Sequence, residues 1–221
     1  MYDIEKRLVK DLSPILRGKG FVWTGSQEQY IRKQPWGFDY IGWSCFDFDS
    51  RGSLELSLII GVRHDAVEDL VNKLELVYGE KNKKYTTTVS RVLRFFPFDS
   101  GRGVWQIYRE SANEEIAKFV GHVSDVVDGA GGDFYKKYSN VLECSRGLNS
   151  SIDVISHPLC NNFHYRIYNG LTCAMLSEPS RVLELTRQYL DYANITMPVD
   201  VEKIKIKIDK LISFGVDFIK S

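Results

Sequence analysis

The stretch SLELSLIIGV at residues 53–62 limits the possible folds more than any other part of the chain. Apolar side chains occupy every second position in it, namely Leu54, Leu56, Leu58, Ile60 and Val62. Because successive side chains of a strand point to opposite faces, this spacing predicts a strand with one apolar face. The residues DSRG at 49–52 are typical of a turn from an earlier strand. We therefore expect an antiparallel sheet in the first half of the chain.

Helices and further strands are expected around this strand. Apolar residues at helical spacing predict a first helix that ends near Gly18 and Gly20; they are Ile4, Leu8, Leu12 and Ile15. Asp65 and Glu68 have the spacing of an acidic capping box, which predicts a second helix directly after the strand. The segments 86–98 and 104–110 are interpreted as two more strands.

After residue 110 the hydrophobic period changes from two to between three and four. Ser111 and Glu114 fit a capping box. The helix behind it is expected to bury Ile116, Phe119, Val120, Val123 and Val127. Further helices are predicted near 134–146, 158–176, 179–193 and 198–219, and GAGGD at 129–133 is interpreted as a helix stop.

These patterns predict an α+β protein. An antiparallel sheet of about four to five strands with flanking helices is expected in residues 1–110. An all-helical region of about five helices is expected in residues 111–221, packed on the sheet as one unit, since no Pro/Gly/Ser-rich linker separates the two.

Composition excludes several classes of function. The 29 basic and 29 acidic residues balance, which argues against attraction of the whole chain to nucleic acid or an anionic membrane. The charged start MYDIEKRLVKDL lacks the apolar run of a secretory signal, and no apolar window is long enough to span a bilayer. Four widely spaced cysteines fit reduced thiols in a cytoplasm; they are Cys45, Cys144, Cys160 and Cys173.

The aromatic stretch QPWGFDYIGWSCFDFDS at residues 34–50 is interpreted mainly as sheet core. Its even positions are expected to form the core face. Its odd positions are apolar only in the middle and acidic at the ends, as expected if a helix covers the centre of the sheet and the margins face water. Trp36, in a turn, and Trp43, on the mixed face, are expected to be exposed, and tryptophan often anchors interfaces. The predicted partner-binding patch consists of Trp36, Asp39, Trp43, Asp47, Asp49 and Glu55.

Two alternatives involve nucleic acid. Asp49 and Glu55 have a spacing that resembles the metal-binding acids of many nucleases, but Ser57 stands where such sites have a lysine. Residues 81–109 interleave basic and aromatic side chains, a pattern that suits single-stranded nucleic acid. Pairing with the acidic strand margins is an equally good interpretation of these charges.

A zinc site is a weaker alternative. In HPLCNNFH, His157, Cys160 and His164 are spaced as on one face of a helix, with Cys144 or Cys173 available as a fourth ligand. Burial of Cys160 in an apolar helix stripe is the favoured interpretation. We assign no catalytic residue, metal or cofactor.

A short charged helix is expected to end in RGKGF, a strand enters with VW, and YIRKQPWGFDY is followed by SLELSLIIGV. In these features the first 110 residues resemble small bacterial α/β domains, some of which occur among the immunity proteins of polymorphic-toxin systems. The resemblance implies a cytoplasmic, non-enzymatic protein that binds and neutralises a toxin. It transfers no functional residues, although the acidic margins of the patch would suit a basic partner such as a nuclease toxin.

Overall fold

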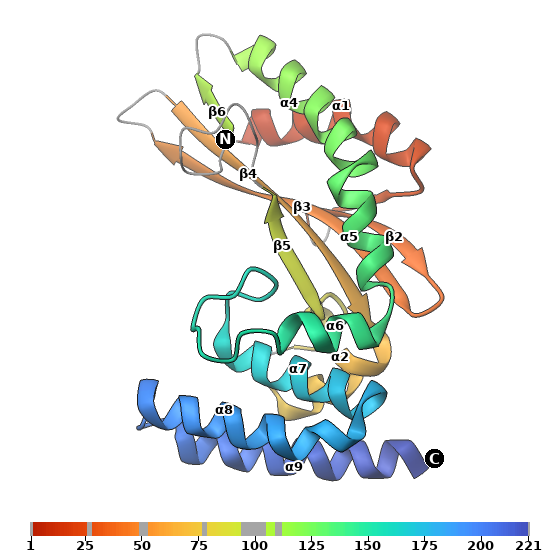
Figure 1. Cartoon of the computed structure of the whole chain (residues 1–221). Coiled ribbons are helices and arrows are strands. Elements are labelled where there is room, and N and C mark those ends of the chain that lie inside the picture. The colour runs from red at the N-terminus through yellow and green to blue at the C-terminus, as the bar shows by residue number, and fades with distance from the viewer. Residues whose placement is uncertain are drawn as a thin grey trace. The chain divides into compact units, whose positions relative to one another are not determined.

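The computed structural model describes residues 2–25, 28–48, 53–76, 79–93, 105–108 and 112–220 (Figure 1). The strands are β1 (Val22–Thr24), β2 (Gln29–Gln34), β3 (Gly37–Phe48), β4 (Ser53–His64), β5 (Val89–Leu93) and β6 (Trp105–Tyr108). The helices are α1 (Tyr2–Gly18), α2 (Asp65–Val71), α3 (Glu80–Lys83), α4 (Ala112–Asp128), α5 (Ala130–Tyr138), α6 (Val141–Leu148), α7 (Phe163–Ser177), α8 (Val182–Thr196) and α9 (Val201–Lys220). The predicted α+β class is confirmed.

The chain divides into two compact units, and neither is a continuous half of the sequence. Unit 1 contains Met1–Gly61 and Arg91–Lys136, whereas unit 2 contains Val62–Ser90 and Lys137–Ser221. These units differ from the expected regions 1–110 and 111–221, because α4 and most of α5 belong with unit 1 and α2 belongs with unit 2. An amphipathic helix joins whichever apolar surface it reaches in space, whatever its place in the chain.

The strands form one sheet in the order β1-β2-β3-β4-β5, with β6 also paired to β4. β1 pairs antiparallel with β2 and β2 with β3, so that Trp23 lies opposite Tyr30 and Tyr30 lies opposite Ile41. β6 pairs antiparallel with the start of β4, from Ser53 opposite Tyr108 to Leu56 opposite Trp105. These registers decide which side chains share a face of the sheet.

In unit 1, helix α1 packs on the sheet and against α4, and the two helices lie side by side in Figure 1. Leu8, Leu12 and Leu16 of α1 are buried. The Tyr30 hydroxyl joins α1 to β2 through contacts with Ser13 Oγ at 2.9 Å and the Val9 carbonyl at 3.0 Å. The stripe predicted for α4 is confirmed at every position; its buried residues are Ile116, Phe119, Val120, Val123 and Val127.

Both faces of β3 are buried near its middle. Phe38 and Tyr40, on the predicted core face, are buried, and Ile41, in the apolar middle of the other face, is buried completely. Ile41 lies opposite Tyr30, which is hydrogen-bonded to α1. Helix α1 covers the neighbouring strand, which agrees with the expectation that a helix covers the apolar middle of the odd face.

Unit 2 is built around α7. This helix packs against α2, α6, α8 and α9, and in Figure 1 the ribbons of α8 and α9 lie side by side. Most of α7 is buried, from Phe163 to Met175 apart from His164 and Tyr165. Gly170 allows close contact here, because a Cβ at that position would lie 2.5 Å from Asn149 Oδ1. A central helix that is buried on nearly all sides explains the apolar character of this segment.

Several predicted helix boundaries were wrong. The helix expected at 134–146 is two helices, because Asn140 caps α6 by accepting a hydrogen bond from Leu142 N at 2.8 Å. The helix expected from residue 158 begins only at Phe163, where Asn162 is the N-cap. GAGGD separates two helices only at Gly129, since α5 begins at Ala130. Local capping by asparagine decided the first two boundaries.

Within the part of the chain that the structure describes, no helix has the length and apolar character needed to cross a bilayer.

Candidate functional site

An aromatic ladder crosses the first three strands of unit 1. Trp43 on β3 and Trp23 on β1 are half-buried and stack with ring centroids 5.4 Å apart and planes 11° apart. The Tyr30 ring lies 4.9 Å from Trp23 and 6.1 Å from Trp43. Sequence reasoning selected Trp43 but missed Trp23, because the pairing depends on the strand register. The change to a period of two from Phe21 onward indicated a strand here, and it was the sequence signal that pointed to Trp23.

Trp36 occupies a different position from this ladder. It lies with Pro35 in the tight turn between β2 and β3, which closes where Gln34 pairs with Gly37, and its side chain is half-buried. The structure therefore confirms the turn position that was predicted for Trp36.

Asp39 was predicted to lie on the contact surface, and this placement was wrong. Its side chain is 1% exposed and its Oδ2 accepts hydrogen bonds from Arg32 Nη2 at 2.9 Å and from Gln34 Nε2 at 2.6 Å. The Arg32 guanidinium lies over the rings of Phe21 and Tyr135, with centroids at 4.5 and 5.0 Å. The carboxylate is part of an internal ion pair, because the register places it opposite an arginine.

The other predicted acids are only partly covered by the structure. Glu55 is half-buried on β4, opposite Gln106 of β6. The side chain of Asp47 and the whole of Asp49 lie outside the described residues. No group of three His, Cys, Asp or Glu side chains in the described ranges could hold a metal ion. The nuclease interpretation of Asp49 and Glu55 therefore stays a prediction. Binding of single-stranded nucleic acid by residues 81–109 also stays a prediction, because residues 94–104 and 109 lie outside the described part of the chain.

The three residues of the possible zinc site do not share a helix face, and that prediction was wrong. His157 and Cys160 pair through their backbones in the loop before α7, and only His164 is helical. His157 Nδ1 accepts a hydrogen bond from Leu159 N at 3.2 Å, and Cys160 Sγ donates to the Asn162 carbonyl at 3.3 Å. Burial raises the pKa of the Cys160 thiol to about 11. The Asn162 cap keeps residues 157–162 out of the helix.

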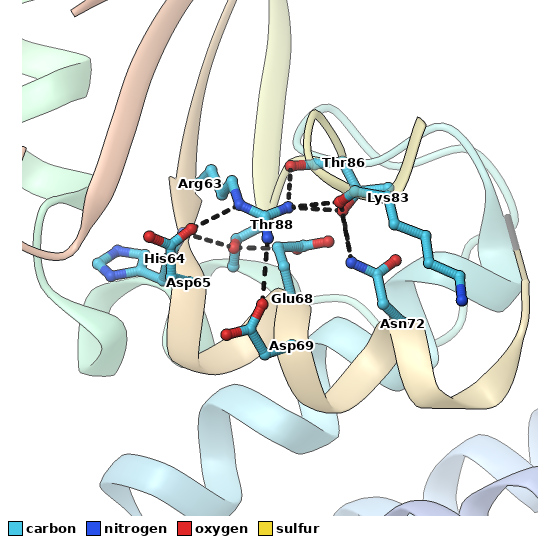
Figure 2. A network of polar contacts seen from close by, with 9 residues as sticks. All are labelled: Arg63, His64, Asp65, Glu68, Asp69, Asn72, Lys83, Thr86 and Thr88. Atoms are coloured by element: carbon cyan, nitrogen blue, oxygen red, sulfur yellow. Dashed lines mark hydrogen bonds and ion pairs between the residues drawn. The ribbon is translucent and has the colours of Figure 1, made fainter. Parts of the chain in front are cut away.

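A dense polar network occupies unit 2 where β4 ends (Figure 2). The nearly buried Arg63 side chain donates from Nε to Asp65 at 2.6 Å and from Nη2 to Asp69 at 3.4 Å. Its Nη1 donates to the carbonyls of Lys83 and Thr86, each at 3.0 Å, and to Thr86 Oγ1 at 2.8 Å. One guanidinium therefore ties β4 to α2 and to the segment that leads into β5.

Glu68 lies at the centre of this network and is completely buried. Its Oε1 accepts a hydrogen bond from Thr88 Oγ1 at 3.0 Å, and that hydroxyl accepts one from His64 N at 3.0 Å. Burial raises the pKa of Glu68, against the opposing effects of the Thr86 and Thr88 hydroxyls and of Arg63. The predicted Asp65–Glu68 capping box was wrong, because no side chain caps α2 and Glu68 faces the interior.

The network stabilises unit 2 and does not present reactive groups. Arg63 donates to five acceptors, and Glu68 has no contact with solvent through which a substrate could approach. His64 is also buried, with Nε2 2.8 Å from the Tyr138 carbonyl, which identifies Nε2 as the protonated nitrogen in this contact. A pocket of about 290 Å³ beside the network is lined partly by surface lysines, of which Lys83 already pairs with Glu80 at 2.9 Å.

The raised pKa of Glu68 predicts a specific dependence of stability on pH. The neutral carboxyl is favoured in the folded state, so its contribution is complete below the unfolded pKa of about 4.5 and is lost as pH rises through the folded pKa. Glu68→Gln keeps an acceptor for Thr88 but cannot ionise. We expect its free energy of unfolding, relative to the unmodified protein, to increase with pH in urea titrations between pH 4 and pH 8.

Glu202→Gln, at an exposed position of α9, is the control and is expected to leave this pH dependence unchanged. A constant difference between the Glu68→Gln and unmodified proteins at every pH would contradict the assignment.

The fold and these side chains define an α+β protein with an aromatic ladder on its sheet and a structural polar network in its helical unit. Comparisons with protein-family models, with curated proteins and with solved structures find no match.

Proposed function

We propose that this chain is a non-enzymatic cytoplasmic binding protein that neutralises a protein partner, in the manner of a bacterial immunity protein. The observation that carries the proposal is the half-buried Trp23–Trp43 stack. Stacked, partly exposed indoles offer a large, rigid contact area at low entropic cost, and tryptophan is enriched among residues that dominate binding energy.

The surroundings of the stack support a contact role. β1 lies at one edge of the described sheet, and its Val22 is 60% exposed on the opposite face from Trp23. The Tyr30 hydroxyl holds the middle of the ladder to α1, so the indoles are ordered before any partner arrives. A pre-ordered surface loses less conformational entropy on binding.

The thiols and buried acids support a non-enzymatic role. Burial raises the pKa of Cys144 to about 12 and places that of Cys173 well above its ordinary value, so both thiols are protonated and weakly nucleophilic at neutral pH. The buried carboxyls of Asp39 and Glu68 take part in internal hydrogen bonds.

The proposal is tested by co-expression with the products of neighbouring genes. We expect one such product to be toxic alone, to lose its toxicity when this chain is present, and to purify with it as a stoichiometric complex. If every neighbouring product is harmless, or if toxicity persists although both proteins are produced, the immunity function is wrong.

The contact surface is tested by Trp43→Ala and Trp36→Ala. Each is expected to weaken the complex by about tenfold or more, because loss of an interface tryptophan typically costs over 1–2 kcal/mol. Titration calorimetry measures this effect, and thermal unfolding confirms that each variant is folded. Leu183→Ala removes a 73% exposed apolar side chain from unit 2 and should leave the affinity unchanged. If all three variants bind the partner with equal affinity, Trp36 and Trp43 are not part of the interface.

A further inference from the structure

Unit 2 contains a groove that no sequence pattern indicated. It has a volume of about 430 Å³ and lies between the loop 149–153 and one face of α8, from which Gln188, Asp191, Tyr192 and Ile195 line it. These four residues follow the i, i+3, i+4, i+7 spacing of a single helix face. Tyr192 and Ile195 supply apolar surface, and Ile195 is 78% exposed.

The loop wall of the groove is fixed from behind by buried polar side chains. Arg166 of α7, which has no exposed surface, donates from Nη2 to the carbonyls of Ile152 at 3.0 Å and Val154 at 2.5 Å. Asn149 accepts a hydrogen bond from the Tyr189 hydroxyl at 2.8 Å and donates to the Gly170 carbonyl at 3.1 Å. The groove is therefore held in shape by contacts with two helices, and a ligand need not order it.

The α8 wall is fixed in the same way. The Tyr192 ring packs edge-on against Phe163 of α7, with centroids 5.5 Å apart and planes at 65°. Tyr192 therefore contacts the buried Phe163 and also lines the groove, so packing against α7 limits the positions that its ring can take.

The charged side chains that line the groove are both acidic. Asp153 and Asp191 are both exposed and line it, and neither has an ion pair with another described residue. No lysine or arginine is among its described lining residues. Two open carboxylates beside an aliphatic side chain and a tyrosine ring complement a side chain with an apolar stem and a cationic end.

We infer that this groove binds an arginine or lysine side chain presented by an extended segment of a partner protein. The apolar stem lies along Ile195 and Tyr192, and the cationic group reaches Asp153 and Asp191. This inference rests on the groove alone and goes beyond the proposed function, since none of the groove residues belongs to the Trp23–Trp43 stack.

The inference is tested with terminally blocked peptides on the full chain. Binding of GGRGG, GGKGG, GGQGG and GGEGG is followed by amide chemical shifts in two-dimensional NMR. The basic peptides are expected to give saturable shifts at residues 149–153 and 188–195, weakened by added salt, whereas GGQGG and GGEGG give none there. Asp191→Asn and Asp153→Asn should each weaken binding of GGRGG roughly fivefold, the equivalent of about 1 kcal/mol for a solvent-exposed ion pair.

Asp209→Asn, at an exposed position of α9, is the matched control and should bind GGRGG like the unmodified chain. Absence of saturable shifts with the basic peptides, equal shifts with GGEGG, or equal affinity in all three variants would overturn the inference. Because the peptides require no cognate toxin, this result is independent of the co-expression experiment, and each proposal can fail while the other stands.

Discussion

Replacing Arg63 by methionine is expected to lower the free energy of unfolding by about 2–4 kcal/mol. Methionine keeps part of the apolar stem but removes every donor of the guanidinium. The carbonyls of Lys83 and Thr86 would lose their hydrogen bonds from Arg63, and Asp65 would lose its contact at 2.6 Å. The segment 80–88 would then be held to α2 and its C-cap by the Thr88–Glu68 hydrogen bond and by Asn72, which also donates to the Lys83 carbonyl.

Urea denaturation measures this loss of stability, and amide hydrogen exchange shows whether residues 80–88 open first. Arg187→Met, at an exposed position of α8, is the matched control and should change stability by no more than about 0.5 kcal/mol. Arg63→Lys should recover only part of the loss, because an ammonium cannot reproduce the planar fork of donors. If Arg63→Met and Arg187→Met have equal effects, the network does not support unit 2 as described.

Gly170→Ala is expected to destabilise the protein by about 1–3 kcal/mol, although alanine is the better helix former. The added Cβ would lie 2.5 Å from Asn149 Oδ1 and 3.0 Å from the Tyr189 hydroxyl. These two groups share a 2.8 Å hydrogen bond, so relief of the clash would disturb a satisfied buried contact. The close approach of α7 to Asn149 and Tyr189 therefore requires glycine at this position.

Gly121→Ala is expected to have the opposite effect on stability and serves as the comparison in the same experiment. Gly121 lies within α4 and a Cβ there would meet nothing within 4 Å, so alanine should stabilise the protein by about 0.5–1 kcal/mol. Thermal unfolding distinguishes the two variants by the sign of the shift in melting temperature. A stabilising effect of Gly170→Ala would show that α7 does not pack against Asn149 and Tyr189 in this way.

The elements that were predicted correctly have long, regular hydrophobic periods. The α4 stripe from Ile116 to Val127 and the strand that became β4 were both recognisable, because the pattern repeats over many residues. The last helix was also expected, and α9 buries Ile204, Ile208 and Leu211 as its period requires. Such elements carry enough local information to identify their type without knowledge of their neighbours.

The polar residues were harder to place than the apolar ones. Asp39 and Glu68 look like surface acids in sequence, yet both are buried. The burial of Asp39 follows from the register that sets it opposite Arg32, and that of Glu68 from Thr88, twenty residues later in the chain. No sequence pattern indicates the Asp39–Arg32 or the Glu68–Thr88 pairing, because both depend on chain segments that meet only after folding.

The same distinction applies to the surfaces proposed for binding. Sequence alone selected Trp43 as a contact residue, and its stacking on Trp23 depends on two antiparallel registers in succession. The groove beside α8 combines a loop with a helix face thirty-five residues or more away, and its loop wall depends on the buried Arg166.

The sequence by itself therefore determined the α+β class and the type of the long elements, since hydrophobic periodicity acts over neighbouring residues. Only the tertiary structure decided which acids are internal, which indoles stack and where a groove opens. Those features depend on contacts between distant segments, and burial or exposure of a polar side chain is a property of the whole packed unit.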